Sequence, residues 1–323
     1  MSQNKVAVII PTLNGGEVWL RCLDTLRQQV PPPSHVLIVD SGSTDGTDVA
    51  AVESGFEVLR LAKGTFDHGG TRQMAAERLA AFDVLVYLTQ DAVLASPDAL
   101  AKLVVPFAYP RVGITYGRQL PRLGSSAIEA HARLFNYPPQ SNTRTLADKA
   151  HMGIKAAFTS NSFAAYRTEA LMVVGGFPES LILGEDMVVA ARILQAGWTV
   201  AYVADAQVWH SHGYTLLQEF RRYFDIGVMH QDQAWILRDF GKPEGEGGRF
   251  VRSEFAYLKD HAPWLLPSAS VRTLAKYLGY KLGQRSPSLP LSIKRKLSMH
   301  RGFWDKRGAG RSMADDVMDK GAR

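Results

Sequence analysis

The sequence predicts an α/β fold in which a mainly parallel sheet is flanked by helices. Short apolar, β-branched runs recur along the N-terminal part of the chain, and segments with a helical spacing of apolar residues separate them. Continuous apolar runs of this kind are typical of strands buried on both faces, as in parallel sheets. With 323 residues, of which 46% are hydrophobic, the chain is long enough to bury the core that such a sheet requires.

Strands and helices alternate from the N-terminus onward. Strands are expected at residues 5–11, 35–40, 56–61 and 83–88. Helices are predicted between them at residues 17–28, 45–53 and 71–81. The second helix begins at Asp45, a residue type that favours the N-cap position. This alternation predicts right-handed crossovers within one open sheet.

The pattern is less regular after Ala92. We expect helices at residues 96–105, 184–197 and 216–240, and strands at residues 112–117, 158–166 and 199–203. The polar stretch 118–154 has no clear period and is interpreted as a loop over a site.

A charged, glycine-rich linker is predicted at residues 244–248. It divides the chain into a domain of residues 1–243 and a basic helical C-terminal extension of residues 244–323. From Arg272 to Arg311 the extension carries 11 Lys and Arg but a single aspartate, so the net charge of +6 belongs to this segment. Its cations stand beside Leu and aromatic residues, which suits an anionic lipid surface. A helical cap with a solvated basic side is the alternative, and both can hold. No nucleic-acid-binding motif accompanies the charge, so nucleic acid is not predicted as a partner.

The single cysteine and the apolar segments limit the class of protein further. Cys22 alone cannot form an internal disulfide or a multi-cysteine zinc site, so any metal must be held by oxygen or imidazole ligands. No run of about 18 apolar residues is present, and the N-terminal apolar stretch stops at Pro11, too short for a secretory signal. We predict a cytoplasmic protein, attached peripherally to the inner face of the cell membrane where the basic extension meets lipid.

Polar clusters follow the first four predicted strands, at residues 11–16, 39–47, 66–73 and 89–92. Ligands of open α/β sheets bind beyond the carboxyl ends of the strands. One such cluster alone is often only turn chemistry, but four in succession at one edge indicate a ligand site. The chain has no G-x-G-x-x-G motif, and Gly70 stands where a P-loop requires lysine, so a P-loop NTPase is not supported.

Three segments, VAVIIPTLN, VDSGSTDGT and GEDMVVAARILQAGW, resemble the inverting family 2 glycosyltransferases, which have the GT-A fold. The resemblance is closer to the rhamnosyltransferase branch, through FDHGGTRQ, LTQDA, WHSHGYTLLQEFRRYFDIG and LPLSIKRKLSMHRGFW, and it covers most of residues 5–304.

The resemblance implies a binding site for a nucleotide-sugar donor. The implied contacts are with Pro11, Thr12, Asn14, Asp40, Gly69, Gly70, Arg72 and Gln90. Asp40 would accept hydrogen bonds from the base imide. Arg72 and the free backbone N–H groups of Gly69 and Gly70 would meet the diphosphate. A surface ion pair is the alternative for Arg72, and Asp45 fits a helix cap better than a binding role.

The resemblance also implies a divalent metal, Mg²⁺ or Mn²⁺. The family's D-x-D motif is replaced here by Thr89-Gln90-Asp91, which leaves Asp91 as the only carboxylate of this motif. Imidazole would come from His210 or His212, with His210 favoured by its position. Both histidines are ordinary loop residues in the alternative interpretation, because side chains at i and i+2 of an extended chain point opposite ways.

Glu185 and Asp186 are the implied catalytic pair, with Asp186 as general base in a metal-assisted single displacement. Helix capping is the alternative role. The implied reaction moves L-rhamnose from dTDP-L-rhamnose to a saccharide or lipid-linked acceptor in surface polysaccharide synthesis. Another UDP- or dTDP-sugar is the alternative donor. A sugar-1-phosphate nucleotidyltransferase and a non-catalytic scaffold are the alternative classes. The enzyme interpretation requires Asp40, Asp91 and Asp186 to meet in one cleft.

Overall fold

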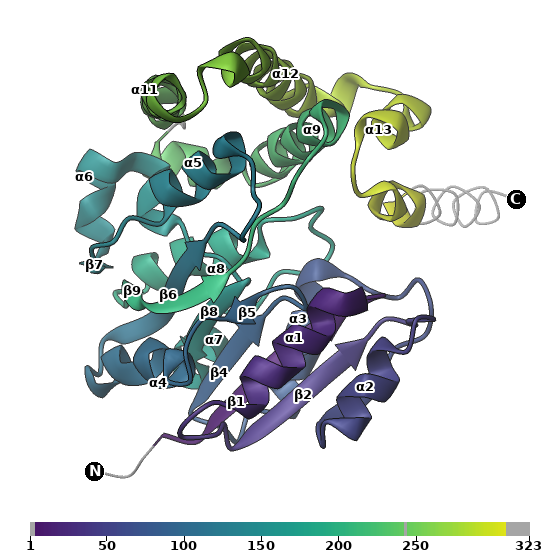
Figure 1. Cartoon of the computed structure of the whole chain (residues 1–323), viewed down its shortest axis with the longest axis vertical. Helices are drawn as coiled ribbons and strands as arrows, with labels where there is room; N and C mark the ends of the chain where they lie inside the picture. The colour runs from purple at the N-terminus through teal and green to yellow at the C-terminus, as the bar shows by residue number, and fades with distance from the viewer. Residues whose placement is uncertain (1–3, 242–243, 308–323) are drawn as a thin grey trace, which may run out of the picture.

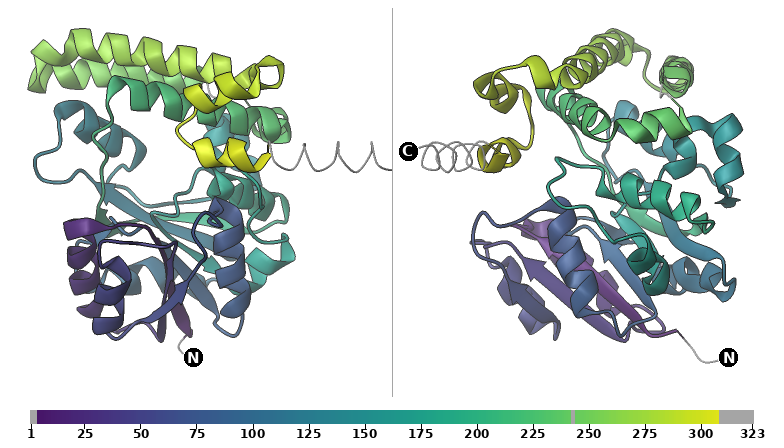
Figure 2. Two further views of the ribbon diagram at one scale, coloured as in Figure 1. Left: turned by 90° about the vertical axis from the view of Figure 1, so that its right-hand side faces the viewer. Right: turned by 180° about the vertical axis from the view of Figure 1, so that it is seen from behind.

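The computed structural model describes residues 4–241 and 244–307. Over these residues the strands form one sheet in the order β3-β2-β1-β4-β8-β6-β9-β5, with β7 paired to β9 (Figure 1). The predicted α/β class is therefore confirmed. The C-terminal helices lie at the end of the molecule opposite the N-terminus (Figure 2).

The N-terminal half follows the predicted alternation. Four parallel strands form this part of the sheet: β1 (Val6–Thr12), β2 (His35–Asp40), β3 (Glu57–Arg60) and β4 (Val84–Leu88). The helices between them are α1 (Gly16–Arg27), α2 (Thr47–Glu53) and α3 (His68–Arg78). The side chains of α1 pack on one face of these strands and those of α3 on the other, which explains why the strands are apolar throughout.

The second half makes the sheet mixed. β8 (Phe163–Arg167) is antiparallel to both β4 and β6 (Val112–Leu120), and β9 (Thr199–Trp209) is parallel to β6. The short strands β5 (Val93–Leu94) and β7 (Asn142–Arg144) are antiparallel to β9. β1 to β4, β6 and β9 thus run one way, and β5, β7 and β8 run the other. The further helices of this half are α4 (Ala99–Val104), α7 (Thr168–Val173) and α8 (Glu185–Gln195).

Three sequence predictions about these segments are wrong. The expected loop 118–154 contains the end of β6, α5 (Ala127–Asn136), β7 and α6 (Lys149–Met152). The expected helix 216–240 is divided at Gln233 into α9 (Leu216–Asp232) and α10 (Ala234–Phe240). The expected linker 244–248 is the start of α11 (Glu244–His261).

The C-terminal helices pack closely on α9. α12 (Leu266–Gln284) crosses α9 where glycines face each other, and α13 (Leu291–Leu297) follows it. A Cβ atom on Gly283 would lie 2.0 Å from the carbonyl oxygen of Phe224, and one on Gly279 would lie 2.4 Å from that of Phe220. The cap interpretation of the extension therefore holds for residues 244–307, whereas the boundary at residue 243 stays a prediction. Residues 308–323 of the predicted extension lie outside the described residues.

No helix in the described part of the chain is both long enough and apolar enough to cross a lipid bilayer.

The glycine contact between α9 and α12 gives a first testable prediction. Gly283→Ala should destabilise the fold by about 1–3 kcal/mol, because the added methyl group must push two backbones apart. Gly245→Ala in α11 is the matched control, since its Cβ would meet no atom within 4 Å. Thermal unfolding measures both variants. Equal or higher stability of Gly283→Ala would contradict the close packing.

Candidate active site

Two cavities lie beyond the carboxyl ends of the strands. The central cavity, of about 520 Å³, is lined by residues of α3, α5, α8, α9 and α12, including Arg72, Asp186, His210 and His212. The lateral cavity, of about 610 Å³, is lined by the loops after β1, β2 and β3 and by the C-terminal segment around Phe303. Both volumes are in the range of small-molecule sites, which is roughly 300–1,000 Å³.

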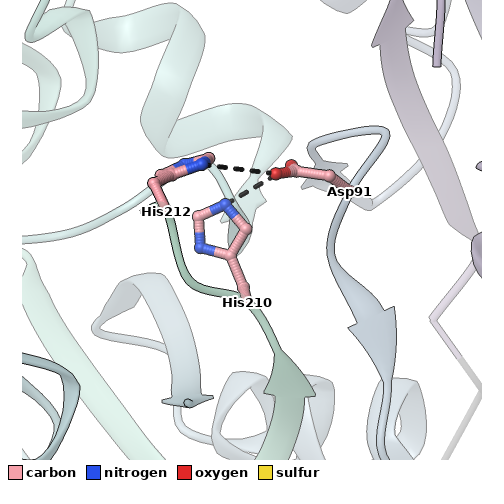
Figure 3. A group of neighbouring side chains, drawn as sticks. All are labelled: Asp91, His210 and His212. Atoms are coloured by element: carbon pink, nitrogen blue, oxygen red, sulfur yellow. Dashed lines mark ion pairs between the residues drawn. The ribbon is translucent and has the colours of Figure 1, made fainter. Parts of the chain in front are cut away.

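Asp91, His210 and His212 form a cluster beside the central cavity (Figure 3). His210 Nε2 lies 3.3 Å from Asp91 Oδ1, and His212 Nδ1 lies 3.7 Å from Asp91 Oδ2. The candidate ligand atoms of the three residues all lie within 4.8 Å of one another. The structure therefore brings together both predicted histidines, and it does not favour one of them over the other.

The protein around the cluster prepares it for a cation. His210 Nδ1 hydrogen-bonds to Gln119 Oε1 at 2.8 Å. Because an amide oxygen only accepts, Nδ1 carries the proton and the lone pair of the buried Nε2 faces Asp91. That buried Nε2 has no hydrogen-bond partner among the described residues. An orphaned acceptor, a second imidazole and a carboxylate fit a divalent cation.

Electrostatics supports the same conclusion. Burial lowers the pKa of His210, and burial together with His210 lowers the pKa of His212 to about 3. Burial opposes ionisation of Asp91, but the attraction of the protonated form of either histidine outweighs burial and lowers the pKa of Asp91 below the usual range. Two neutral imidazoles and one carboxylate are the protonation states that metal binding needs. Arg122 also contacts this carboxylate, at 3.2 Å, which no sequence motif indicated.

Glu185 and Asp186 begin α8 directly after Gly184, whose φ of 82° is in the left-handed region that favours glycine. Glu185 is buried, lies 3.3 Å from Arg72 Nη1 and accepts a hydrogen bond from Asn161 Nδ2 at 3.0 Å. Asp186 is half-buried, lines the central cavity and accepts the backbone N–H groups of Met187 and Asn161. The two adjacent carboxylates therefore have different surroundings.

Their pKa values separate accordingly. Burial raises the pKa of Asp186 to about 7, and the neighbouring Glu185 carboxylate adds to this effect. Burial also opposes ionisation of Glu185, but Arg72 and His68 outweigh it, so its pKa lies below the usual value. Asp186 is thus a carboxylate that can exchange a proton near neutral pH.

The residues predicted to bind the nucleotide sugar at the ends of β1 and β2 form hydrogen bonds within and between the loops that follow these strands. Asp40 is buried, and its carboxylate accepts hydrogen bonds from Thr12 Oγ1, Ser43 Oγ and the N–H groups of Gly42 and Ser43. Protein donors therefore occupy Asp40, and it lines neither cavity. Its contact with a base stays a prediction, and so does the meeting of all three acids in one cleft: Asp186 lines the central cavity, and Asp91 lies beside it through its contacts with the lining residues His210 and His212.

The neighbouring loop residues are held by the same network. Asn14 accepts the N–H of Thr44 at 2.9 Å and lines the lateral cavity. Asp45 accepts the N–H and hydroxyl of Thr47 as well as the N–H of Gly16, so its role is structural. Pro11 is half-buried at the end of β1.

At the start of α3, the expected free N–H of Gly70 and the surface alternative for Arg72 are wrong, whereas the role of the Gly69 N–H stays a prediction. The N–H of Gly70 is not free, because it donates to Oδ1 of Asp67, the N-cap residue, at 2.6 Å. Gly69 is pressed against the chain, since a Cβ there would lie 1.7 Å from the carbonyl oxygen of Pro178. Arg72 is not a surface cation but the buried partner of Glu185.

Gln90, from the altered metal motif, joins two loops. Its side-chain amide accepts the N–H of Leu13 at 2.7 Å and donates to the carbonyl oxygen of Leu13 at 3.0 Å. These two hydrogen bonds join the loop that carries Asp91 to the loop after β1, and the contact of Gln90 with a donor stays a prediction.

Sequence reasoning missed several site residues. Gln119 and Asn161 have no local signal, because they matter only through His210 and Glu185. His68 lies within the quoted FDHGGTRQ segment but was given no role, although it lines both cavities. Arg222 of α9 lines the central cavity and has no ion-pair partner among the described residues.

Together, the sheet order and this edge-of-sheet site define a glycosyltransferase of the GT-A fold. Among solved structures, the chain is similar to a mannosyltransferase from Pyrobaculum calidifontis, solved with GDP-Man and Mn²⁺. The TM-score is 0.54 at 24% identity, over 94% of this chain and 86% of that one. Residues 1–349 of TarS from S. aureus give a TM-score of 0.53 at 18% identity, over 88% and 91% of the two chains.

The sequence comparisons give the family. The model of "Glycosyltransferase like family 2" matches residues 3–224. The chain is 46% identical to the O-antigen chain rhamnosyltransferase RfbN of Salmonella typhimurium, over 93% of this chain and 96% of that protein. It is 44% identical to WbaN, an O-antigen chain rhamnosyltransferase of Salmonella anatum, over 92% and 95%. The chain belongs to glycosyltransferase family 2, and its resemblance to the rhamnosyltransferase branch is confirmed. The nucleotidyltransferase and scaffold alternatives are set aside.

The bond between Gln119 and His210 gives a second prediction. Gln119→Ala should weaken Mn²⁺ binding by about 10–100-fold, because His210 loses the acceptor that fixes its tautomer. Gln119→Glu, which keeps an acceptor oxygen, is the matched control and should bind much as the unaltered protein does. Titration calorimetry or Mn²⁺ electron paramagnetic resonance measures the affinity. If Gln119→Ala and His210→Ala both bind Mn²⁺ as tightly as the unaltered protein does, the metal site is contradicted.

Proposed function

We propose that this enzyme transfers L-rhamnose from dTDP-L-rhamnose to a saccharide acceptor during surface polysaccharide synthesis, with inversion at the anomeric carbon and Asp186 as general base. One observation carries the mechanism: the Asp186 carboxylate, held by the N–H groups of Met187 and Asn161, lines the same cavity as the imidazoles of His210 and His212. The names of the relatives RfbN and WbaN support rhamnose as the sugar and O-antigen-type polysaccharide as the product class.

The two cavities bind different parts of the substrates. The lateral cavity takes the nucleoside of the donor, because it opens among the loops after the first three strands, where Asn14, Ser41 and Gly42 line it. The central cavity takes the sugar and the acceptor. It extends from Asp186 to α5, α9 and α12, where Arg133 and Tyr223 are among its lining residues.

The reaction is a single displacement. Asp186 accepts the proton of an acceptor hydroxyl as that oxygen attacks the anomeric carbon of rhamnose. The bond from this carbon to the diphosphate oxygen breaks on the opposite face, and dTDP leaves with the electron pair. A β-linked donor therefore gives an α-L-rhamnoside. Glu185 stays ionised against Arg72 and does not take the proton.

Asp91, His210 and His212 would hold a divalent cation, which supplies positive charge to the leaving diphosphate. We propose Mn²⁺ rather than Mg²⁺ as this cation, because Mg²⁺ prefers oxygen ligands and two of these three ligands are imidazoles. Arg222 lines the same cavity without an ion-pair partner among the described residues, and it supplements the charge there.

We further propose that α12 attaches the enzyme to an anionic membrane surface, which suits a lipid-linked acceptor. The outward face of α12 carries exposed apolar side chains: Val271, Leu274, Tyr277 and Leu278, which are 47–57% exposed. An apolar stripe on a helix beside cations is typical of interfacial attachment.

The role of Asp186 gives a third prediction. The rate should rise with pH through about 7, because the base is protonated below that pH and ionised above it. Asp186→Asn should lower kcat by roughly 10²–10⁴-fold. A discontinuous assay of rhamnosyl transfer from pH 5.5 to 9 measures both. Asp205→Asn, an exposed aspartate of β9, is the control. Wild-type kcat in Asp186→Asn would overturn the assignment of the base.

The attachment of α12 gives a fourth prediction. Leu274→Glu should reduce co-sedimentation with phosphatidylglycerol-containing vesicles, because it places a charge in the apolar stripe. Val173→Glu, 68% exposed on the distant helix α7, is the matched control. Equal sedimentation of Leu274→Glu and of the unaltered protein would contradict attachment through this face.

A further inference from the structure

The C-terminal segment 299–307 contacts both cavities of the active site. Its residues His300, Gly302, Phe303, Lys306 and Arg307 line the lateral cavity, and His300 also lines the central one. The rest of the lateral cavity comes from the loops at the sheet edge and from residues 180–182. The loops on one side of the lateral cavity and the C-terminal segment on the other therefore lie far apart in the sequence.

The segment is firmly anchored in this position. The carboxylate of Asp225 accepts the N–H groups of Met299 at 2.9 Å and His300 at 3.2 Å. Trp304 is buried in a cluster with Ile182 and Phe224. These contacts hold the segment from the side of α9.

The other side of the segment is fixed to the loop after β3. Lys306 Nζ donates to the carbonyl oxygens of Phe66 at 2.8 Å and Thr65 at 3.2 Å. Arg307 pairs with Asp232 at 2.9 Å and lies over the ring of Phe303 at 5.1 Å. The wall that the segment forms is therefore a fixed part of the cavity.

The two cavities meet at a pair of imidazoles. His68 and His300 are the side chains that line both cavities, and their rings are in edge contact with centroids 4.9 Å apart. A donor with its nucleoside in the lateral cavity and its sugar in the central cavity must pass its diphosphate beside this pair. Imidazole N–H groups are suitable donors for phosphate oxygens.

We propose that the C-terminal segment is a wall of the donor-nucleotide site, with Gly302 and Phe303 against the nucleoside and His300, together with His68, beside the diphosphate. This proposal rests on the proposed function, because it takes a nucleoside diphosphate as the occupant of the lateral cavity. It gives the C-terminal extension a direct role in donor binding, in addition to covering the acceptor end of the site.

Gly302 allows a test that leaves the packing intact. A Cβ on Gly302 would meet no atom within 4 Å, and the residue is exposed. Gly302→Glu therefore adds a carboxylate at the cavity wall. Arg301→Glu is the matched control, because Arg301 is exposed, lines neither cavity and changes the charge by more. Thermal unfolding first shows that both full-length variants are folded.

Binding of dTDP, measured by titration calorimetry with Mn²⁺ present, should weaken at least tenfold in Gly302→Glu and less than twofold in Arg301→Glu. The donor KM should rise more in Gly302→Glu than in Arg301→Glu, whereas the acceptor KM should not change. His300→Ala should likewise raise the donor KM, and His300→Gln, which keeps an N–H donor, should restore part of it. Unchanged dTDP affinity in folded Gly302→Glu would overturn the proposal.

Failure of the proposed function has a different outcome. Unaltered protein that binds UDP but not dTDP would contradict the proposed donor. The same two variants would then be compared with UDP as the probe, and a selective loss in Gly302→Glu would still support the C-terminal wall. An equal loss of nucleotide affinity in both variants would indicate a general charge effect and would overturn the proposed role of the C-terminal segment.

Discussion

The buried ion pair between Arg72 and Glu185 is the interaction on which the catalytic end of the molecule depends. It joins α3 to the first turn of α8 at 3.3 Å, and both side chains are only 7% exposed. Two adjacent carboxylates follow Gly184, and one of them receives the guanidinium. That asymmetry keeps Glu185 ionised, and the ionised Glu185 adds to the effect of burial, which raises the pKa of Asp186. Two neighbouring acids thereby acquire pKa values that lie on opposite sides of the usual range, as the proposed division between a structural acid and a base requires.

The same ion pair positions the junction of the two cavities. Arg72 Nη1 also donates to the carbonyl oxygen of His68 at 2.7 Å, one helical turn earlier. His68 is therefore held at the place where the central and lateral cavities meet, against His300. Removing one partner of a buried pair typically costs about 3–5 kcal/mol, because the other charge remains buried without compensation. The proposed base and the proposed diphosphate position thus share one structural support.

The sequence allowed the sheet to be predicted because its strands are buried on both faces and read as continuous apolar runs. The cluster of Asp91 with His210 and His212 was also anticipated, through the resemblance. The argument that two histidines at i and i+2 must diverge failed, because β9 ends at Trp209 and its alternation does not continue past that residue. Their rings lie with centroids 4.5 Å apart.

The rest could not be predicted, because nearby polar groups compete for the same partners. The N–H of Gly70 was counted as a phosphate donor, yet Asp67 three residues earlier is a good N-cap and takes it. The loop that follows Asp40 supplies several hydrogen-bond donors to its carboxylate, which the sequence did not indicate, and its contact with a base stays a prediction. The signal for α5 was visible as Ser126 and Glu129, a capping box, but it was lost in the polar stretch around it. Contacts such as that of Gln119 with His210 join residues far apart in sequence and have no local pattern.

The charge of the C-terminal extension illustrates why composition alone misleads. Arg272 and Lys276 suggested a basic outer face, but both pair with Glu219 and line the central cavity. Lys306 and Arg307 are likewise held by carbonyl oxygens and Asp232 beside the lateral cavity. These four cations line the two cavities, while the outward side of α12 carries exposed apolar side chains. Attraction of α12 to a membrane would therefore depend on buried apolar area more than on charge, and salt would screen it little, since screening acts on exposed charges. The cations of the basic extension therefore fall into two groups: these four line the cavities, whereas Arg285, Arg295, Lys296 and Arg301 are exposed and line neither cavity.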